Sequence, residues 1–205
     1  MHSEVLTKKA EKLFSCFSVF KNFYLAGGTA LAFQLGHRTS IDFDFFSEKP
    51  ITKNLLKTIE RAFRGIHLEV RVNNKDELTF FADEVKITAL HYPFPLLLPL
   101  VKFRNIRVAS SKEIALMKAY TIGRRGSFKD YIDLYFILKE KVAGLPEIVD
   151  GAGKKFKSAF DVRLFLEQLL YFEDLRDTKI EFLKRRVGME EMKKFFEEEI
   201  KNIKL

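Results

Sequence analysis

Two aspartates separated by one residue, Asp42 and Asp44, are the side chains best placed for metal chemistry. Residues 41–46 alternate apolar and acidic side chains, which predicts a strand with both carboxylates on one face and Ile41 on the other. Neighbouring carboxylates repel each other unless a cation lies between them, and hard divalent cations prefer oxygen ligands. A pair of such ions activates an attacking hydroxyl and stabilises a leaving pyrophosphate. The spacing therefore predicts a site for Mg²⁺, or for Mn²⁺ in its place.

Two other interpretations of this acidic pair compete with the metal site. A solvated edge strand also carries acids, but here an unbroken apolar face with Phe43 and Phe45 anchors the strand. A phosphatase of the haloacid dehalogenase type also uses Asp-x-Asp, but it requires an apolar strand leading into the first aspartate. Residues 37–40 read His-Arg-Thr-Ser instead, so the phosphatase interpretation is disfavoured.

A glycine pair lies upstream, where residues 25–31 read Leu-Ala-Gly-Gly-Thr-Ala-Leu. The apolar run 23–26 predicts a strand, and residues 29–35 predict a short helix that Gly36 ends. Glycines let the backbone approach a phosphate closely, and the amides that open a helix attract anions. Gly27 and Gly28 are therefore either a plain turn or, given the acids downstream, a phosphate-binding turn.

Lys118 falls on the packed side of a predicted helix over residues 114–122. A lysine in that position needs a partner, because buried ammonium groups are rarely tolerated alone. Either its stem lies along apolar surface with the charge in water, or the ammonium binds phosphate.

Residues 124–135 carry a further group of charges. Arg124 and Arg125 suit a triphosphate or nucleic acid. A purely structural interpretation is also open: Ser127 caps a helix, Asp130 favours its positive end, and Lys129 pairs with Asp133 one turn on.

The elements that must position these groups follow a simple order. Strands are predicted at 23–26, 41–46, 67–72, 78–82, 85–92 and 106–109. Helices are predicted at 3–20, 29–35, 52–63, 114–122, 129–139, 145–151, 159–171 and 189–202. The pattern predicts an α+β fold, with an α/β domain over residues 1–109 and a helical region over residues 110–205 that completes the active-site cleft.

Composition narrows the class of protein. The 205 residues carry a formal net charge of +8, which favours an anionic partner such as nucleic acid or a nucleoside triphosphate. A single cysteine, Cys16, excludes an intramolecular disulfide and suits a reducing compartment, and its apolar neighbours make it a core residue. The start of the chain has no secretory pattern, and the longest apolar stretch, 92–101, contains three prolines and is too short to span a bilayer. We expect a soluble cytoplasmic protein with no membrane partner.

Residues 25–31 and 36–46 together closely resemble the first motif of the AbiEii/AbiGii nucleotidyltransferase-like toxins, within the DNA-polymerase-β-like nucleotidyltransferase superfamily. The resemblance implies a nucleotidyltransferase fold with a mixed sheet and flanking helices. It implies that Asp42 and Asp44 are metal ligands. It also implies that the nucleotide is bound by Gly27, Gly28, Thr29, Ser40, Lys118, Arg124 and Arg125.

A later motif of the same family resembles residues 129–135, Lys-Asp-Tyr-Ile-Asp-Leu-Tyr. By this resemblance Asp130 completes the catalytic set with Asp42, Asp44 and Lys118, and Asp133 is the second candidate. Arg38 is a further candidate, either for phosphate or for pairing with the two acids.

The resemblance implies transfer of a nucleoside monophosphate from a triphosphate to a hydroxyl of RNA, such as tRNA, or of a protein. It also implies a toxin restrained by an antitoxin. One departure supports an alternative: many nucleotidyltransferases carry a third carboxylate on a later strand, where this chain has Thr88, and Glu69 is a poor substitute. A degenerate fold that only binds nucleotide, RNA or protein is therefore the second hypothesis.

Overall fold

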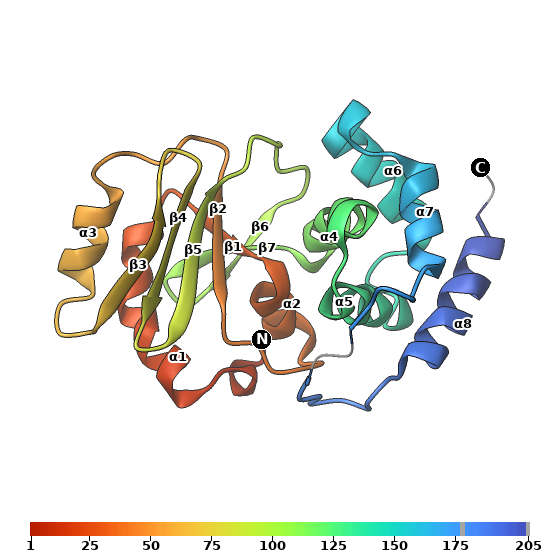
Figure 1. Ribbon diagram of the computed structural model, residues 1–205, viewed down its shortest axis with the longest axis horizontal. Coiled ribbons are helices and arrows are strands. Elements are labelled where there is room, and N and C mark those ends of the chain that lie inside the picture. Colours follow the sequence, from red (N-terminus) through yellow and green to blue (C-terminus); the bar gives the residue numbers. More distant parts are fainter. Residues whose placement is uncertain (177–178, 204–205) are drawn as a thin grey trace. The chain divides into compact units, whose positions relative to one another are not determined.

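The computed structural model describes residues 1–176 and 179–203 (Figure 1). The chain divides into two compact units. Met1–Pro95 and Pro99–Ser110 form the first, and Leu96–Leu98 and Ser111–Leu205 form the second. The first unit contains a seven-stranded sheet and the second is helical, so the predicted α+β class is confirmed. The predicted domain boundary at 109/110 stays a prediction, because independent folding is what defines a domain.

The sheet of the first unit is mixed, with strand order β3-β4-β5-β2-β1-β7-β6. Strand β1 pairs antiparallel with β2 and parallel with β7, and β2 pairs parallel with β5. The other pairs are antiparallel. The strands are β1 Tyr24–Ala26, β2 Phe43–Ser47, β3 Leu68–Asn73, β4 Glu77–Ala82, β5 Val85–His91, β6 Leu100–Phe103 and β7 Ile106–Ala109.

Phenylalanines fix β2 in the middle of this sheet. Phe43 and Phe45 are fully buried on one face of the strand. The ring of Phe17 lies 4.7 Å from that of Phe43, and Phe20 stacks on Phe45 at 4.1 Å. Each large ring removes much apolar area from water, so this face strongly specifies the register of the strand. The residues between them, including Asp44, must then lie on the opposite face.

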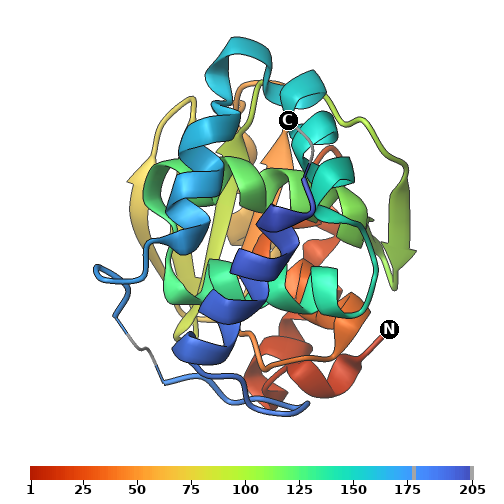
Figure 2. The ribbon, with the colours of Figure 1, turned by 90° about the vertical axis from the view of Figure 1, so that its right-hand side faces the viewer.

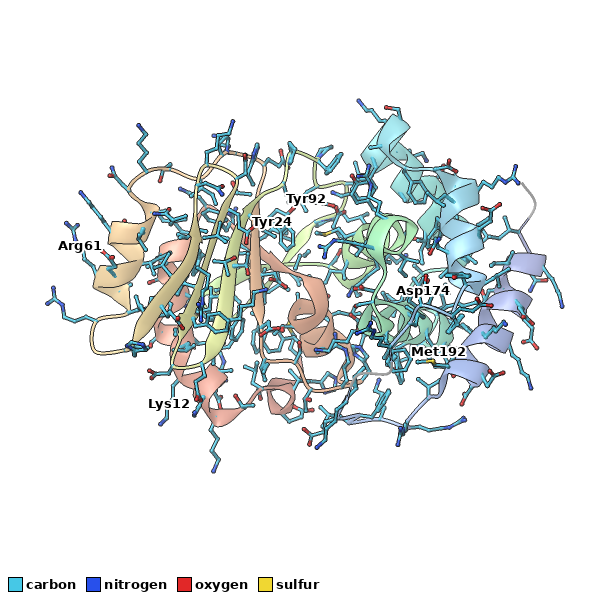
Figure 3. All side chains as sticks on the ribbon, viewed as in Figure 1. Lys12, Tyr24, Arg61, Tyr92, Asp174 and Met192 are labelled. Carbon is cyan, nitrogen blue, oxygen red and sulfur yellow. The ribbon has the colours of Figure 1, made fainter. Side chains whose placement is uncertain are left out.

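The helices of the first unit are η1 Ser3–Val5, α1 Lys8–Lys12, η2 Leu13–Phe20, α2 Gly27–Leu35 and α3 Leu55–Ala62. Residues 13–20, predicted as the end of one helix, form a 3₁₀ helix that presents Phe17 and Phe20 to the sheet. Arg61 on α3 points away from the strands (Figure 3).

The second unit contains α4 Ser111–Arg125, α5 Phe128–Lys139, α6 Leu145–Phe156, η3 Lys157–Ala159, α7 Val162–Leu170 and α8 Met189–Lys201. Helix α4 contacts α5, α6 and α7, and α8 contacts α5 and α7 (Figure 2). Met192 and Phe196 are the buried residues of α8. None of the helices in the described ranges combines the length and apolar character needed to cross a membrane.

Several predictions about elements were wrong in detail. Helix α3 begins at Leu55 rather than at the predicted residue 52, after a turn in which the Leu55 amide donates to the Thr52 carbonyl. The edge strand β6 was missed among the prolines. Strand β2 begins at Phe43, so Asp42 precedes it, and Ile41 is 46% exposed rather than packed.

Candidate active site

Gly27 and Asp44 lie in direct contact at the point where β1 passes into α2. The antiparallel register places Ala26 opposite Asp44, and α2 begins at the next residue, Gly27. Gly27 has φ +73°, and a Cβ built on it would lie 3.0 Å from Asp44 Oδ2. Both the left-handed backbone and the close carboxylate require glycine here. The start of α2, with its free amides, is therefore adjacent to an acidic side chain.

Two hydroxyls hold the chain that leads into the acidic pair. The buried Thr29 hydroxyl donates to the Asp42 carbonyl. A hydroxyl has one proton, so the Ser40 hydroxyl is the donor in its 2.7 Å contact with Thr29 Oγ1. The side chains of Thr29 and Ser40 thus position the backbone at Asp42. Their predicted role at the nucleotide stays a prediction.

The N-terminal segment supports the same loop from outside. The Ser40 amide donates to the Val5 carbonyl, and the His2 amide donates to the Phe33 carbonyl. Gly36 ends α2 with φ +63°, and a Cβ there would lie 2.7 Å from the His2 ring. Sequence reasoning missed this support, because the residues involved are distant along the chain.

Thr88 lies directly beside Asp44 on the neighbouring parallel strand β5. Thr79 of β4 is opposite Thr88, with their hydroxyl oxygens 3.4 Å apart, and its hydroxyl donates to Glu77 at 2.6 Å. Paired residues on adjacent strands share a face, so this face presents hydroxyls next to the acid. Glu69, the other residue considered, is exposed on edge strand β3 and pairs with Arg71.

Asp42 and Asp44 make up the acidic set at this site. Both are half-buried, while Phe43 and Phe45 between and after them are buried. In the described part of the chain no group of three or more His, Cys, Asp or Glu side chains gathers as a metal cluster. Two carboxylates nevertheless fit Mg²⁺, which commonly binds through one or two carboxylates and completes its shell with water and substrate phosphates.

Lys118 in the second unit is buried between two aspartates. Its Nζ lies 2.7 Å from Asp130 Oδ1 and 2.6 Å from Asp133 Oδ2, and the Asp133 side chain is fully buried. The ammonium therefore does not reach into solvent, and its partners are two carboxylates. Binding of phosphate by Lys118 stays a prediction. The predicted pairing of Lys129 with Asp133 is wrong, because Lys129 is exposed and Asp133 is turned inward.

Ser127 and Asp130 together form a capping box at the start of α5. The structural interpretation predicted a capping role for Ser127. The Ser127 amide and hydroxyl donate to Asp130 Oδ2 at 2.9 and 2.7 Å. Burial would raise the pKa of Asp130, but the Lys118 ammonium and the Ser127 donors outweigh it and hold the pKa below its ordinary value. Asp130 is thus ionised at neutral pH.

The remaining predicted residues are three arginines. Arg124 is exposed, with its guanidinium 4.6 Å from the Tyr120 ring, and Arg125 is exposed at the end of α4. Arg38 is buried, and its NH1 donates to the Thr39 carbonyl at 3.0 Å. Roles for these arginines in binding phosphate stay predictions.

The structure brings Gly27, Asp42 and Asp44 together in the first unit. It brings Lys118, Asp130 and Asp133 together in the second. Each half has the composition of a phosphoryl-transfer site: helix amides and carboxylates in one, a buried cation with acids in the other.

Comparison with known proteins agrees with these features. Residues 11–94 match the family described as "Nucleotidyl transferase AbiEii toxin, Type IV TA system". An uncharacterized protein of Aquifex aeolicus (strain VF5), aq_aa25, is 37% identical over 188 residues, covering 89% of this chain and 88% of that protein.

Two solved structures share the fold. The nucleotidyltransferase toxin MenT4 of Mycobacterium tuberculosis H37Rv matches with a TM-score of 0.62 at 15% identity, over 96% of this chain and 85% of that one. JHP933 from Helicobacter pylori matches with a TM-score of 0.51 at 20% identity, over 80% and 90%.

The fold and the family match together define a nucleotidyltransferase. The chain belongs to the AbiEii nucleotidyl transferase toxin family.

Proposed function

We propose that the protein transfers a nucleoside monophosphate from a nucleoside triphosphate to a hydroxyl of an RNA acceptor such as tRNA, in a Mg²⁺-dependent reaction in the cytoplasm. The contact between Gly27 and Asp44 carries this proposal. It puts the free amides at the start of α2 next to a carboxylate, so that a phosphate bound at the amides lies beside a group that holds a cation.

In the first unit, the amides at Gly27 and Gly28 bind the terminal phosphates of the triphosphate. Asp42 and Asp44 hold Mg²⁺, or Mn²⁺, which when bound neutralises the charge that develops on the phosphates. Thr29 and Ser40 keep Asp42 in place through the hydroxyl contacts described above.

Asp130 in the second unit orients the acceptor hydroxyl. Lys118 keeps Asp130 ionised, so that it accepts a hydrogen bond from a hydroxyl at neutral pH. The acceptor oxygen bonds to the α-phosphorus, the bond from that phosphorus to the bridging oxygen breaks, pyrophosphate leaves, and the hydroxyl proton passes to solvent. Arg124 and Arg125 assist by binding phosphate.

As a family member, the protein acts as a toxin whose partner is an antitoxin. Unregulated modification of an acceptor RNA inhibits growth, which is why restraint by a partner accompanies this activity. Co-expression of the product of a neighbouring gene should relieve growth inhibition caused by the wild-type chain.

The test is incubation of the protein with each labelled nucleoside triphosphate, Mg²⁺ and bulk tRNA. Label should appear in the RNA with wild type and be lost with Asp42→Asn and with Asp44→Asn. The matched control is Asp83→Asn, an exposed aspartate of the same unit with φ +45°, a conformation that asparagine tolerates. That variant should retain full transfer.

The second candidate function is a degenerate fold that binds nucleotide, RNA or protein without transfer. Thr88 beside Asp44 is the observation that favours it. Binding of Mg²⁺ and triphosphate, with no label on any RNA or protein acceptor, would establish that function and rule out transfer. Unchanged Mg²⁺ affinity in Asp44→Asn would show that the proposed metal site is wrong.

A further inference from the structure

A cavity in the helical unit lies at the start of α5. Its volume is about 410 Å³, within the range of small-ligand sites. Phe128, Phe182 and other apolar residues line it, and Lys179 and Arg186 add two cations; the remaining lining residues are Ile180, Val187, Gly188 and Met189. Phe128 and Val187 are buried and Phe182 is partly exposed. The cavity thus combines an apolar floor with positive charge at its edge.

The two cations of the cavity differ from their neighbours in sequence. Lys184 pairs with Glu140 at 2.6 Å, and Arg185 pairs with Glu191 at 2.7 Å. Within residues 1–176 and 179–203, neither Lys179 nor Arg186 has an acidic partner, and both are exposed. Their charge is therefore available to a ligand.

One residue that lines the cavity, Phe128, belongs to the helical turn that carries Asp130, the proposed acceptor-side acid. Phe128 is the first residue of α5, and Asp130 lies two residues further in the same helical turn. Ser127, which donates to Asp130, is the residue before Phe128. A ligand in the cavity therefore lies next to the turn that carries Asp130.

We propose that this cavity binds one nucleotide of a single-stranded acceptor RNA, next to the nucleotide that receives the transferred group. This rests on the proposed function, since it takes Asp130 as the acceptor-side acid. Phe182 stacks on the base, and Lys179 and Arg186 bind the adjacent phosphates. Stacking on aromatic side chains beside a basic edge is how proteins bind single strands without reading their sequence. The cavity therefore favours an unpaired end of the acceptor and gives little base selectivity.

An acidic protein segment is the competing ligand for two cations. The aromatic floor argues for nucleic acid, because every base offers a flat face to stack, whereas glutamate and aspartate side chains do not. The net charge of +8 and the position next to Asp130 favour the same ligand.

The test is fluorescence anisotropy with a labelled single-stranded RNA of about ten nucleotides, without triphosphate or Mg²⁺. The double variant Lys179→Ala/Arg186→Ala should bind on the order of tenfold more weakly, with the slope of log affinity against log salt reduced by about 1.4. Phe182→Ala should weaken binding roughly tenfold, and Phe182→Tyr should restore it. Asp83→Asn, the exposed control of the other unit, should bind RNA as wild type does.

The matched control is Lys139→Ala/Lys141→Ala. These lysines line a separate cavity of about 480 Å³ in the same unit. The control therefore removes two positive charges, as the test variant does, but from a different cavity. Equal losses in the two double variants would overturn the subsite and leave only general charge attraction. Equally tight binding of polyglutamate, with the same loss on Lys179→Ala/Arg186→Ala, would show a protein-binding surface instead.

Transfer and binding are measured separately. Loss of transfer to RNA with binding intact would count against the proposed function and not the subsite. Normal transfer with RNA binding unaffected by Lys179→Ala/Arg186→Ala would count against the subsite alone.

Discussion

Asp44 lies between the turn at Gly27 and the neighbouring strand β5. Gly27 lies against its carboxylate, and Thr88 lies beside it on β5. With a neutral Thr88 at this position, the face carries only the two acids, which repel each other less than three carboxylates would before a cation binds. Magnesium affinity should then depend more on the substrate phosphates than on the protein.

Thr88→Asp tests that interpretation directly. A third carboxylate next to Asp44, at a position that is 5% exposed, should lower the free energy of unfolding by about 3–5 kcal/mol without metal, because the new charge is buried and uncompensated. Mg²⁺ should restore much of that loss, since a ligand that binds only the folded state stabilises it. Urea unfolding with and without Mg²⁺ measures both effects. The control Thr88→Asn should gain no more stability from Mg²⁺ than wild type does. A gain as large as that of Thr88→Asp would refute the account.

Lys118 has a structural role whatever its part in catalysis. Lys118→Met leaves Asp130 and Asp133 buried without their cation, and should cost about 3–5 kcal/mol of unfolding free energy. Lys154→Met is the control: it removes a lysine from an exposed pair with Asp150, where the loss should stay below about 1 kcal/mol. Urea unfolding measures both losses. Similar losses in the two variants would mean that the buried Lys118 ion pairs contribute no more stability than the exposed Lys154 pair.

At the scale of elements, the turn from β1 into α2 determines how close the backbone at Gly27 lies to Asp44. Gly27→Ala should be destabilised by about 1–3 kcal/mol, because alanine is strained at φ +73° and its Cβ would press on Asp44 Oδ2. Transfer activity should fall more than stability does, since the carboxylate is displaced. Gly153→Ala on α6, where a Cβ meets nothing within 4 Å, should be neutral or stabilising. Thermal unfolding and the label-transfer assay separate the two effects, and full activity in Gly27→Ala would contradict them.

Much of the element order could be predicted from hydropathy period. Strands β4 and β7 and helix α5 lie within a residue of their predicted bounds, because their patterns are strong and local. Strand β6 was missed because prolines at 93, 95 and 99 indicate only an extended chain. The predicted helix over 3–20 is broken into α1 and two 3₁₀ segments, since packing of Phe17 and Phe20 on the sheet, rather than helix propensity, decides its path.

The site was predictable only where its members are close in sequence. Alternation across residues 42–45 predicted less buried acids between buried phenylalanines, and the structure has that burial pattern, although the strand itself begins one residue after Asp42. The role of the two acids as metal ligands stays a prediction. The contact of Gly27 with Asp44 depends on strand register, and the partners of Lys118 depend on how α4 packs against α5. Neither follows from spacing along the chain. Tyr24 on β1 and Tyr92, directly after β5, both contact the ring of Phe46 on β2, and these contacts were missed for the same reason. Figure 3 labels the two tyrosines.

At the scale of the whole molecule, buried charges connect stability with pH. Asp130 has a pKa below its ordinary value of 3.8 in the folded state, so it binds a proton more readily when unfolded. Its contribution is present above the unfolded pKa and is lost as pH falls through the folded pKa. The difference in unfolding free energy between wild type and Asp130→Asn should therefore be constant from pH 7 to about pH 5 and shrink below about pH 4. Urea unfolding across that range measures it, and a difference that grows on acidification would reverse the sign.

The segment Leu96–Leu98 belongs to the helical unit although the sheet continues after it. The amides of Leu97 and Leu98 donate to Glu113 Oε2 at 3.2 and 3.0 Å, and the other oxygen of Glu113 accepts from Lys155 at 2.6 Å with both charges fully buried. Recombination that exchanged only the residues after 110 between two relatives would combine Glu113 of one protein with the Leu97 and Leu98 amides of the other. Exchange should therefore be tolerated only where Leu96–Leu98 is exchanged together with the helices. Because strands β6 and β7 follow that segment, we expect the sheet and the helices to be inherited together.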